Sequence, residues 1–452
     1  MEDLAHKLAE YAYNLKYSDL SEQAIHEAKK RILDSFGCAI GAFNAEPVGI
    51  VRNLAKNHKD GTATIFGTNY KTSEEWATFV NGTMIRYLDF MDTYFPLGEF
   101  VHPEDTLASI FAVAESEKSS AKDIILAIVL AYEVSCRFVD WVNIRKRGWD
   151  HVIWITIAST LAVSKLLKLT PDKIAEAVSI AVASNIPLRQ IRVGKLSMWK
   201  ALAVAYATKA AVFASYLARD GITGPTEVFE GKLGFFNQIT GKSDFSVDNF
   251  TRKGTNFKIF DVTMKKWPVE SSALSAVEAA FELRKKLNIN DIEKINIQTF
   301  ETAYTIIADK EKWNPTNRET ADHSLPYIVC VALTDGIITE KQFSMKRISD
   351  PKVRDLLKRT TVEMNEEYNK YPWPARPNKI EVVTKSGRIS EEAVYPRGSS
   401  KNPMSDKEVE EKFKNLTEKY LSEKQIEIAV KTIWDFQKVK DIGEFLKLFV
   451  VK

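Results

Sequence analysis

Hydrophobic positions recur at helical spacing through most of the first 260 residues of the chain. Apolar residues at i, i+3, i+4 and i+7 line one face of an α-helix, so this region is predicted to be almost wholly helical. Thr170 followed by Pro171 is a typical helix start. Alanine dominates 198–219, which we expect to be a buried central helix that ends near Gly221. The expected helices are an amphipathic one at the N-terminus and those over 20–41, 120–142, 154–169, 170–183 and 198–219.

The pattern changes near residue 260. One helix is expected over 271–287, capped by Ser271 or Ser272. Further elements are a half-buried strand around 295–299, where apolar and polar residues alternate, a helix over 322–333, and a β-hairpin over 379–395 that turns at Ser386-Gly387.

These elements define the predicted fold class. We predict a mainly α protein with a large all-helical domain and a smaller α+β domain. The helical domain spans 1–261 and is completed by the helical segment 405–452, and the α+β domain spans 262–404.

Composition excludes several classes of protein. The 452 residues carry 63 basic and 60 acidic side chains, with no Lys/Arg block of the kind that binds nucleic acid. The longest apolar run, 124–132, is shorter than the roughly 20 residues that span a bilayer. The N-terminus lacks the basic and apolar regions of a signal peptide. We therefore expect a cytoplasmic protein that binds neither nucleic acid nor membrane.

The three cysteines, Cys38, Cys136 and Cys330, lie far apart and form no CxxC pair. Zinc ribbons and iron–sulfur clusters need closely spaced thiolates. We therefore expect neither a zinc ribbon nor an iron–sulfur cluster.

The segment from Trp76 to Glu115 places polar residues between two apolar, helix-like stretches. Scaffolds usually carry their chemistry on such connecting loops. A carboxylate and an imidazole together supply a proton acceptor and a proton donor near neutral pH. The alternative is structural: Asp89 and Asp92 would cap helices, and His102 would lie on the surface before a helix that starts at Pro103. The polar set is Asn81, Asp89, Asp92, Thr93, His102, Glu104 and Asp105.

Three further motifs carry candidate groups. Asp150-His151 precedes a helix, where Asp150 could equally be the N-cap and His151 a residue of the first turn. Cations at 189–200 lie just before and at the start of the Ala-rich helix. This cluster indicates carboxylate recognition, because guanidinium binds carboxylate bidentately. The segment 265–272 lies at the domain junction, where ligands often bind, although a solvated linker is the alternative. The cations are Arg189, Arg192, Lys195 and Lys200, and the junction holds Lys265, Lys266 and Glu270.

Taken together, these segments resemble the MmgE/PrpD family. The similarity runs nearly end to end and in family order. It is carried by LDSFGCAIGA at 33–42, WATFVNGTMIRYLDFMDTY at 76–94, HPEDTLASIFAVAE at 102–115, GWDHVIWITIASTLAVSKLLKL at 148–169, MWKALAVAYATKAAV at 198–212, GPTEVFEGKLGFF at 224–236, KKWPVESSALSAVEAA at 265–280, ADHSLPYIV at 321–329 and YPRGSSKNPMSD at 395–406.

The resemblance implies a fold and an activity. The expected fold is a helical domain and an α+β lid domain with the active site between them. The expected protein is a homodimer without metal or organic cofactor. The expected activity is elimination of water from a 2-hydroxy tricarboxylate, 2-methylcitrate above all. The alternatives on the same scaffold are a citrate or cis-aconitate hydro-lyase, a cis-aconitate decarboxylase and an iminodisuccinate-type epimerase. A helical binding protein without catalysis is an alternative of another class.

The resemblance also implies site residues. Asp89 and Thr93 fall on the family's DFxDT motif, His102 on its His-Pro motif and His151 on its second histidine site. Glu270 matches the dehydratase branch, whereas Ser272 and Ser399 depart from residues found in many dehydratases. The expected catalytic residues are Asp89, Thr93, His102, His151 and Lys265, with His102 or Asp89 as base and His151 as acid. The expected substrate-binding residues are Arg192, Lys195, Glu270 and Tyr304.

Overall fold

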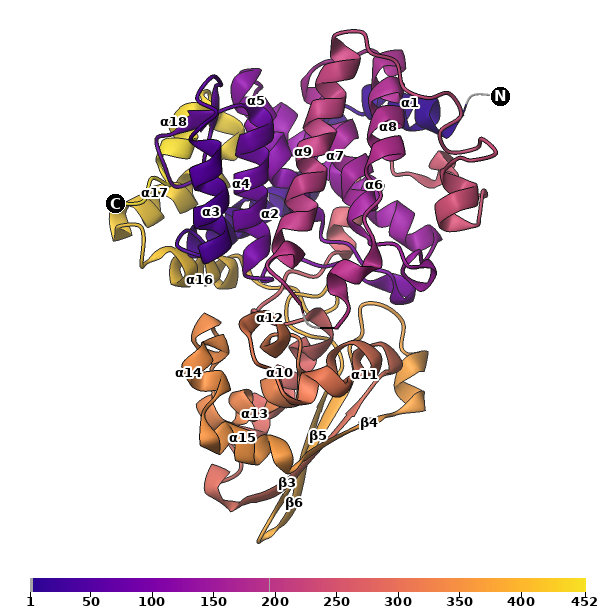
Figure 1. Cartoon of the computed structure of the whole chain (residues 1–452). Helices are drawn as coiled ribbons and strands as arrows, with labels where there is room; N and C mark the ends of the chain where they lie inside the picture. The colour runs from indigo at the N-terminus through magenta and orange to yellow at the C-terminus, as the bar shows by residue number, and fades with distance from the viewer. Residues whose placement is uncertain (1–2, 195) are drawn as a thin grey trace. The chain divides into compact units, whose positions relative to one another are not determined.

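The computed structural model describes residues 3–194 and 196–452 and is mainly α-helical, which confirms the predicted fold class (Figure 1). The chain divides into two compact units. Unit 1 contains the residues up to Ile191 together with Trp199–Val262 and Ser405–Lys452, and unit 2 contains Arg192–Met198 and Thr263–Met404.

Unit 1 is built from helices and one small two-stranded sheet. The helices are α1 (Leu4–Asn14), α2 (Glu22–Gly41), α3 (Glu46–Ala55), α4 (Glu74–Tyr87), α5 (Leu107–Ser116), α6 (Ala121–Trp141), α7 (Val152–Leu166), α8 (Pro171–Ser184), α9 (Trp199–Arg219), α16 (Asp406–Thr417), α17 (Glu423–Trp434) and α18 (Ile442–Lys447). The sheet pairs β1 (Ala63–Thr64) with β2 (Lys71–Thr72) in antiparallel fashion.

Side-chain caps start several of these helices. Ser120 accepts a hydrogen bond from the Asp123 amide, and the Asp123 side chain bonds back to the Ser120 amide, which makes a capping box at the start of α6. Ser21 caps α2 in the same way through the amide of Ala24. Thr170 occupies the N-cap position of α8 before Pro171, as predicted, but its side chain makes no capping hydrogen bond.

Helix α9 is the central helix of unit 1, as its alanines predict. It packs against α4, α7 and α8, and a Cβ added to Gly82 of α4 would lie 3.0 Å from the Cβ of Ala205. Small residues therefore let these two helices approach closely. By length and composition α9 could cross a membrane, but 56% of its most apolar window is buried within the protein, as in the core helix of a soluble fold.

The prediction of helix up to residue 260 is wrong after Gly221. Residues 222–262 contain only short helical turns, at Phe236–Thr240, Val247–Asn249 and Lys258–Asp261. Glycines at positive φ, including Gly241 and Gly254, and the Gly224-Pro225 step break the backbone too often for an α-helix to propagate.

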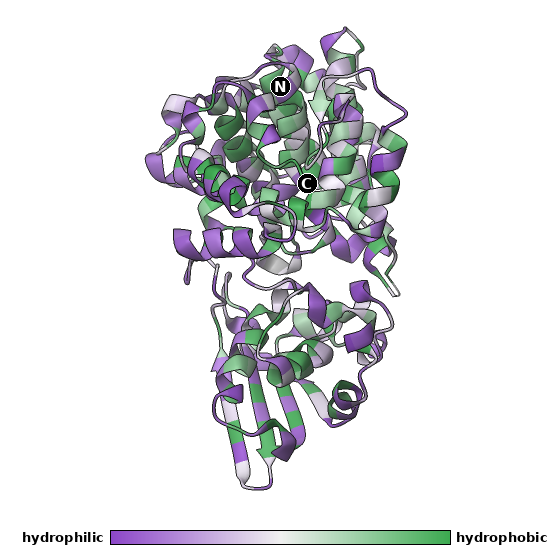
Figure 2. Ribbon diagram, turned by 90° about the vertical axis from the view of Figure 1, so that its left-hand side faces the viewer, coloured by the Kyte–Doolittle hydropathy of each residue, from purple (hydrophilic) through white to green (hydrophobic). Residues whose placement is uncertain are grey.

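Unit 2 contains a four-stranded sheet in the order β4-β3-β5-β6. The strands are β3 (Ile292–Thr299), β4 (Thr360–Met364), β5 (Asn378–Thr384) and β6 (Gly387–Ala393). Strand β3 runs parallel to β4 and antiparallel to β5, and β5 pairs with β6 in the predicted hairpin, with Thr384 opposite Gly387. Figure 2 shows hydrophobic and hydrophilic residues alternating along these strands, as expected for a sheet buried on one face.

Two helices cover the buried face of this sheet. Helices α10 (Leu274–Arg284) and α13 (Leu325–Asp335) pack against each other and against the strands, and together they build the core of unit 2. The remaining helices are α11 (Glu301–Ile307), α12 (Arg318–Ala321), α14 (Met345–Ile348) and α15 (Pro351–Lys358).

Two predicted helix starts in unit 2 are shifted. Glu270, and not Ser271 or Ser272, is the N-cap of the turn that precedes α10, because its carboxylate accepts the amide of Ser272. Helix α13 begins at Leu325, since Ser324 caps it through the amide of Tyr327 and Asp322 ends α12.

Candidate functional site

A short antiparallel bridge organises the polar loop between α4 and α5. The amide of Tyr94 donates to the carbonyl of Val101 and the amide of Val101 donates to the carbonyl of Tyr94, each at 2.9 Å. The next residues outward from such a pair face each other across the two chain segments. The bridge therefore places Thr93 opposite His102, on the side of the bridge that leads to α4 and α5.

The same loop fixes the ring of His102. Its Nδ1 lies 2.7 Å from the carbonyl oxygen of Asp92, and the side chain is 4% exposed. A carbonyl oxygen only accepts hydrogen bonds, so Nδ1 of His102 is the donor in this contact. His102 is thus buried, with its Nδ1 bonded to the backbone of the loop.

A second histidine faces the first. The rings of His102 and His151 meet edge to face, with centroids 5.5 Å apart, and the ring of Phe100 lies 4.1 Å from that of His151. Nδ1 of His151 lies 3.2 Å from Oδ1 of Asp150, and the guanidinium of Arg189 lies 3.7 Å from the other carboxylate oxygen. A carboxylate beside an imidazole stabilises its cationic form.

Asp89 has an unusual backbone conformation at the end of α4. Its φ is 52°, in the left-handed region that L-residues other than glycine seldom adopt. The carboxylate is 2% exposed, forms an ion pair with Arg86, and lies 3.5 Å from Nζ of Lys200 at the start of α9. Nε of Arg86 also lies 3.9 Å from Asp105, so two carboxylates flank one buried guanidinium.

Asp92 and Glu104 form a buried acidic pair within the segment between α4 and α5. Burial raises the pKa of Asp92 to about 6, although the Arg31 guanidinium and the hydrogen bond from the Tyr132 hydroxyl, at 2.6 Å, oppose this shift. Burial, Asp34 and Asp92 together raise the pKa of Glu104 well above its usual range. Burial therefore disfavours the charged forms of both carboxyl groups.

Glu99 is a further buried carboxyl group of the loop. Burial raises its pKa to about 7, despite hydrogen bonds from the backbone amides of Arg145 and Phe100. Glu99 therefore titrates close to physiological pH.

Four predicted site residues lie in unit 1, namely Asp89, Thr93, His102 and His151, and the rings of the two histidines meet. All four are buried, and the Thr93 hydroxyl has no hydrogen-bond partner among residues 3–194 and 196–452. The structural alternative for His102 as a surface residue is wrong. The alternative for Asp150 as the N-cap is wrong, because His151 occupies the N-cap position of α7. Asp150 precedes it, accepts the Val152 amide and lies beside His151.

The other predicted residues belong to unit 2, apart from Lys195, which lies outside the described residues. Lys265 is buried, and Tyr304 of α11 is 41% exposed. Glu270 caps the turn before α10 and lies close enough to the buried Arg376 to interact with it electrostatically. Arg192 begins the short segment that clusters with unit 2.

Sequence reasoning missed Arg86, Glu99 and the role of Lys200. In the sequence, Arg86 stands in the polar last turn of an amphipathic helix, and Lys200 is one of several neighbouring cations. Only their burial, at 2% exposure for Arg86 and 6% for Lys200, reveals their part in the site. The described residues contain no group of three or more His, Cys, Asp or Glu side chains that could hold a metal ion.

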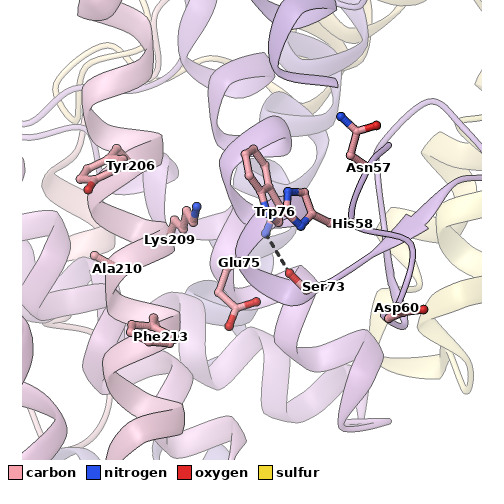
Figure 3. Close-up of a pocket in the computed structure, with 10 residues that line it drawn as sticks. All are labelled: Asn57, His58, Asp60, Ser73, Glu75, Trp76, Tyr206, Lys209, Ala210 and Phe213. Atoms are coloured by element: carbon pink, nitrogen blue, oxygen red, sulfur yellow. Dashed lines mark hydrogen bonds between the residues drawn. The ribbon is translucent and has the colours of Figure 1, made fainter. Parts of the chain in front are cut away.

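A separate groove of about 550 Å³ lies elsewhere on unit 1 (Figure 3). Trp76 stacks on His58 on one side, with ring centroids 4.6 Å apart, while Tyr206 and Phe213 of α9 line the other side. Nζ of Lys209 lies 4.3 Å from the Trp76 ring centroid. None of the predicted site residues lines this groove.

Comparison with known proteins agrees with this architecture. The MmgE/PrpD N-terminal domain model matches residues 6–248, and the C-terminal domain model matches residues 267–435. The chain is 29% identical to the mitochondrial 2-methylcitrate dehydratase of Yarrowia lipolytica, over 98% of this chain and 89% of the relative. It is 29% identical to the 2-methylcitrate dehydratase of Cupriavidus necator over 85% of this chain and 84% of the relative.

A relative with another name is nearly as similar. The human cis-aconitate decarboxylase is 26% identical over 98% of this chain and 93% of its own length. Because dehydratases and decarboxylases are both similar to this chain, the comparison identifies the family and does not identify the substrate. On the strength of both domain matches, the chain belongs to the MmgE/PrpD family.

Proposed function

We propose that this protein is a lyase that eliminates water from a 2-hydroxy tricarboxylate, with 2-methylcitrate as its substrate and 2-methyl-cis-aconitate as its product. The facing pair of His102 and His151, held by different partners, carries this proposal. Elimination needs one group that accepts a proton from carbon and a second that donates a proton to the departing hydroxide. Two buried imidazoles, one bonded to a backbone carbonyl and the other beside a carboxylate, fit these two tasks.

His102 is the proposed base. The Asp92 carbonyl holds the proton on Nδ1, so Nε2 can take the proton from the carbon next to a substrate carboxylate. Asp89 is the alternative base, but its carboxylate is already paired with Arg86 and Lys200. An ion-paired carboxylate is a weaker base, which favours His102.

His151 is the proposed acid. The neighbouring Asp150 carboxylate supports its protonated form, and the proton passes to the hydroxide as the carbon–oxygen bond breaks, giving water and the alkene. The C–H electrons form the new double bond, so no oxidant or reductant is required.

Cations must stabilise the negative charge that develops on the carboxylate next to the reacting carbon. We propose Lys265 for this catalytic role. Arg192 and Lys195 are proposed to bind the other carboxylates, because each presents donors that suit a carboxylate. Thr93, Tyr304 and Glu270 are proposed to orient the substrate through hydrogen bonds, and the buried Thr93 hydroxyl supports its assignment.

Decarboxylation of cis-aconitate is the second candidate, since a decarboxylase relative covers almost the whole chain. Glu270 favours dehydration, because the family's decarboxylase branch is expected to carry a histidine at this position. Citrate or cis-aconitate hydration and epimerisation of an imino-dicarboxylate share the same first proton transfer and are tested by the same assays.

The decisive experiment follows the absorbance of the product alkene with purified protein and EDTA, using 2-methylcitrate, citrate and isocitrate in turn. Fastest turnover of 2-methylcitrate, undiminished by EDTA, would support a metal-independent dehydratase. Release of CO₂ from cis-aconitate without dehydration of any citrate would overturn the proposal in favour of decarboxylation.

We further propose a cytoplasmic homodimer that acts in propionate catabolism through the methylcitrate cycle.

The outward face of α9 supports the dimer. Trp199, Tyr206 and Phe213 recur every seven residues and are 43%, 52% and 54% exposed. A helix that is apolar on both faces is usually covered on both. Asp60 and Glu75 beside this face disfavour an anionic membrane surface, and a second copy is the occupant that we propose.

A further inference from the structure

Helix α16 carries a buried lysine, Lys412, that contacts the loop of residues 88–102 after α4, which we call the site loop. Nζ of Lys412 donates a hydrogen bond of 2.7 Å to the carbonyl oxygen of Phe90, and it lies 4.0 Å from the centroid of the Phe90 ring. Phe90 directly follows Asp89 and stands two residues before Asp92. The lysine side chain is only 5% exposed, so these contacts are made away from water.

A carboxylate of α2 holds this lysine in place. Oδ1 of Asp34 lies 2.6 Å from Nζ of Lys412, and the Asp34 side chain is fully buried. Lys412 therefore joins three parts of the chain: its own helix α16, helix α2 through Asp34, and the site loop through Phe90.

Two glycines on α2 permit this arrangement. A Cβ at Gly37 would lie 3.3 Å from the ring of Phe413, and a Cβ at Gly41 would lie 3.1 Å from Leu416. Asp34, Gly37 and Gly41 lie on one face of α2, because they are three and four residues apart. The small residues bring α16 close enough for Lys412 to reach beneath the loop.

The backbone conformation of the site loop next to Phe90 must be stabilised by contacts with the surrounding protein. Asp89 has a left-handed backbone, which an L-residue keeps only when its surroundings enforce it. Arg86 holds the Asp89 side chain, and Tyr132 holds the Asp92 side chain. Lys412 holds the backbone between these two residues.

We propose that Lys412 is a positioning residue that fixes the loop carrying Asp89 and Thr93 through the Phe90 carbonyl, and thereby sets the turnover rate of the site. The catalytic part of this inference rests on the proposed function, whereas the anchoring of the loop can be measured without it. Lys412 acts through Phe90 and is not assigned any contact with substrate.

The test compares Lys412→Met, Lys412→Arg and Lys414→Met. Met removes the charge and the donors but keeps an unbranched stem, Arg keeps both, and Lys414 is an exposed lysine of the same helix. Lys412→Met is expected to lower kcat about 10- to 100-fold with KM changed less than about threefold, because displacement of catalytic groups by about 1 Å has effects of this size. Lys412→Arg should retain most of the turnover, and Lys414→Met all of it.

Hydrogen exchange separates this inference from the proposed function. In Lys412→Met, backbone amides at 88–93 are expected to exchange faster than in the parent, while those of α7 keep their protection; Lys414→Met should leave both unchanged. A parent without dehydratase activity would overturn the proposed function, yet the exchange result would still decide whether Lys412 anchors the loop. Unchanged exchange at 88–93 in Lys412→Met would overturn the anchoring, and unchanged kcat would overturn its effect on turnover.

Discussion

His102 and His151 meet edge to face within unit 1, with ring centroids 5.5 Å apart, although one ends the site loop and the other begins α7. His102 is bonded to a backbone carbonyl, while His151 lies beside a carboxylate. Two imidazoles with the same partners would have similar proton affinities. The different partners of His102 and His151 support the proposed assignment of one ring as proton acceptor and the other as proton donor.

Replacing either histidine should therefore abolish turnover without unfolding the protein. His102→Asn and His151→Asn are each expected to lower kcat about 10²- to 10⁴-fold, the range of general acid–base catalysis. Steady-state kinetics with 2-methylcitrate and circular dichroism provide the measurements. His58→Asn, which removes a histidine from the separate groove of Figure 3, is the matched control and should keep full activity. Full turnover by His102→Asn would eliminate His102 as the base.

The left-handed backbone of Asp89 gives a second prediction. Asp89→Gly and Asp89→Ala both remove the carboxylate, so both should lose activity to a similar extent. Their stabilities should differ, because alanine at φ 52° is strained by about 1–2 kcal/mol whereas glycine is not. Thermal unfolding should therefore place Asp89→Gly above Asp89→Ala. Equal melting temperatures would show that the loop relaxes to another conformation.

The close packing between α2, α16 and the site loop makes Gly41 sensitive to enlargement. A Cβ there would lie 3.1 Å from both Leu416 of α16 and Leu88 of the loop. We expect Gly41→Ala to destabilise the protein by about 1–3 kcal/mol, as overpacking does, and to lower kcat by displacing Leu88.

Gly49 supplies the control for this substitution. It lies inside α3 with nothing within 4 Å of an added Cβ. Gly49→Ala should therefore stabilise the protein by roughly 0.5–1 kcal/mol, since alanine is the better helix former. Thermal shifts of the same sign for both variants would contradict the predicted crowding at Gly41.

The raised pKa of Glu99 predicts a specific pH dependence of stability. With a pKa near 7 in the folded protein and a lower one in the unfolded chain, the folded state binds the additional proton between these values. The contribution of Glu99 to stability is therefore greatest at acidic pH and is lost as pH rises through about 7, by up to about 3 kcal/mol. Glu99→Gln removes this titration, so its stability relative to the parent should improve steadily from about pH 4.5 to 8. Melting temperatures of both proteins across this pH range provide the test. A difference between the two melting temperatures that does not change with pH would show that Glu99 does not titrate in this range.

Local signals made much of the fold predictable. Ser120 starts α6, the Thr170-Pro171 step starts α8, and Ser386-Gly387 turns the hairpin, because caps and turns depend on a few adjacent residues. The exceptions also have local causes. Glu270 replaced the expected serine cap because its longer side chain folds back onto the Ser272 amide.

The site was predictable only in part. Asp89, Thr93 and His102 share one polar loop, which stands out between apolar helices. Arg86 and Lys412 could not be recognised, because each lies in a segment that reads as the polar side of an amphipathic helix. Their burial is decided by tertiary packing between segments far apart in the chain, which one sequence does not display.

The exposed aromatic face of α9 leads to the last prediction. If a second copy covers Trp199, Tyr206 and Phe213, a charge placed in the middle of this face should separate the dimer. Tyr206→Glu is the chosen variant because Tyr206 is 52% exposed and its loss leaves no cavity in the core. Light scattering after gel filtration should report a dimer for the parent and a monomer for the variant, since a charge buried without a partner is costly at an interface.

A matched control distinguishes this surface from apolar surface in general. Leu233 is 81% exposed in unit 1 and lies outside the α9 face, so Leu233→Glu should leave the dimer intact. Dissociation by both variants would indicate a different interface or general destabilisation. A monomeric parent would refute the dimer outright, and binding of the parent to vesicles, lost in Tyr206→Glu, would assign the face to a membrane. An interface built on α9 therefore requires three results: the parent is a dimer, Tyr206→Glu dissociates it, and Leu233→Glu does not.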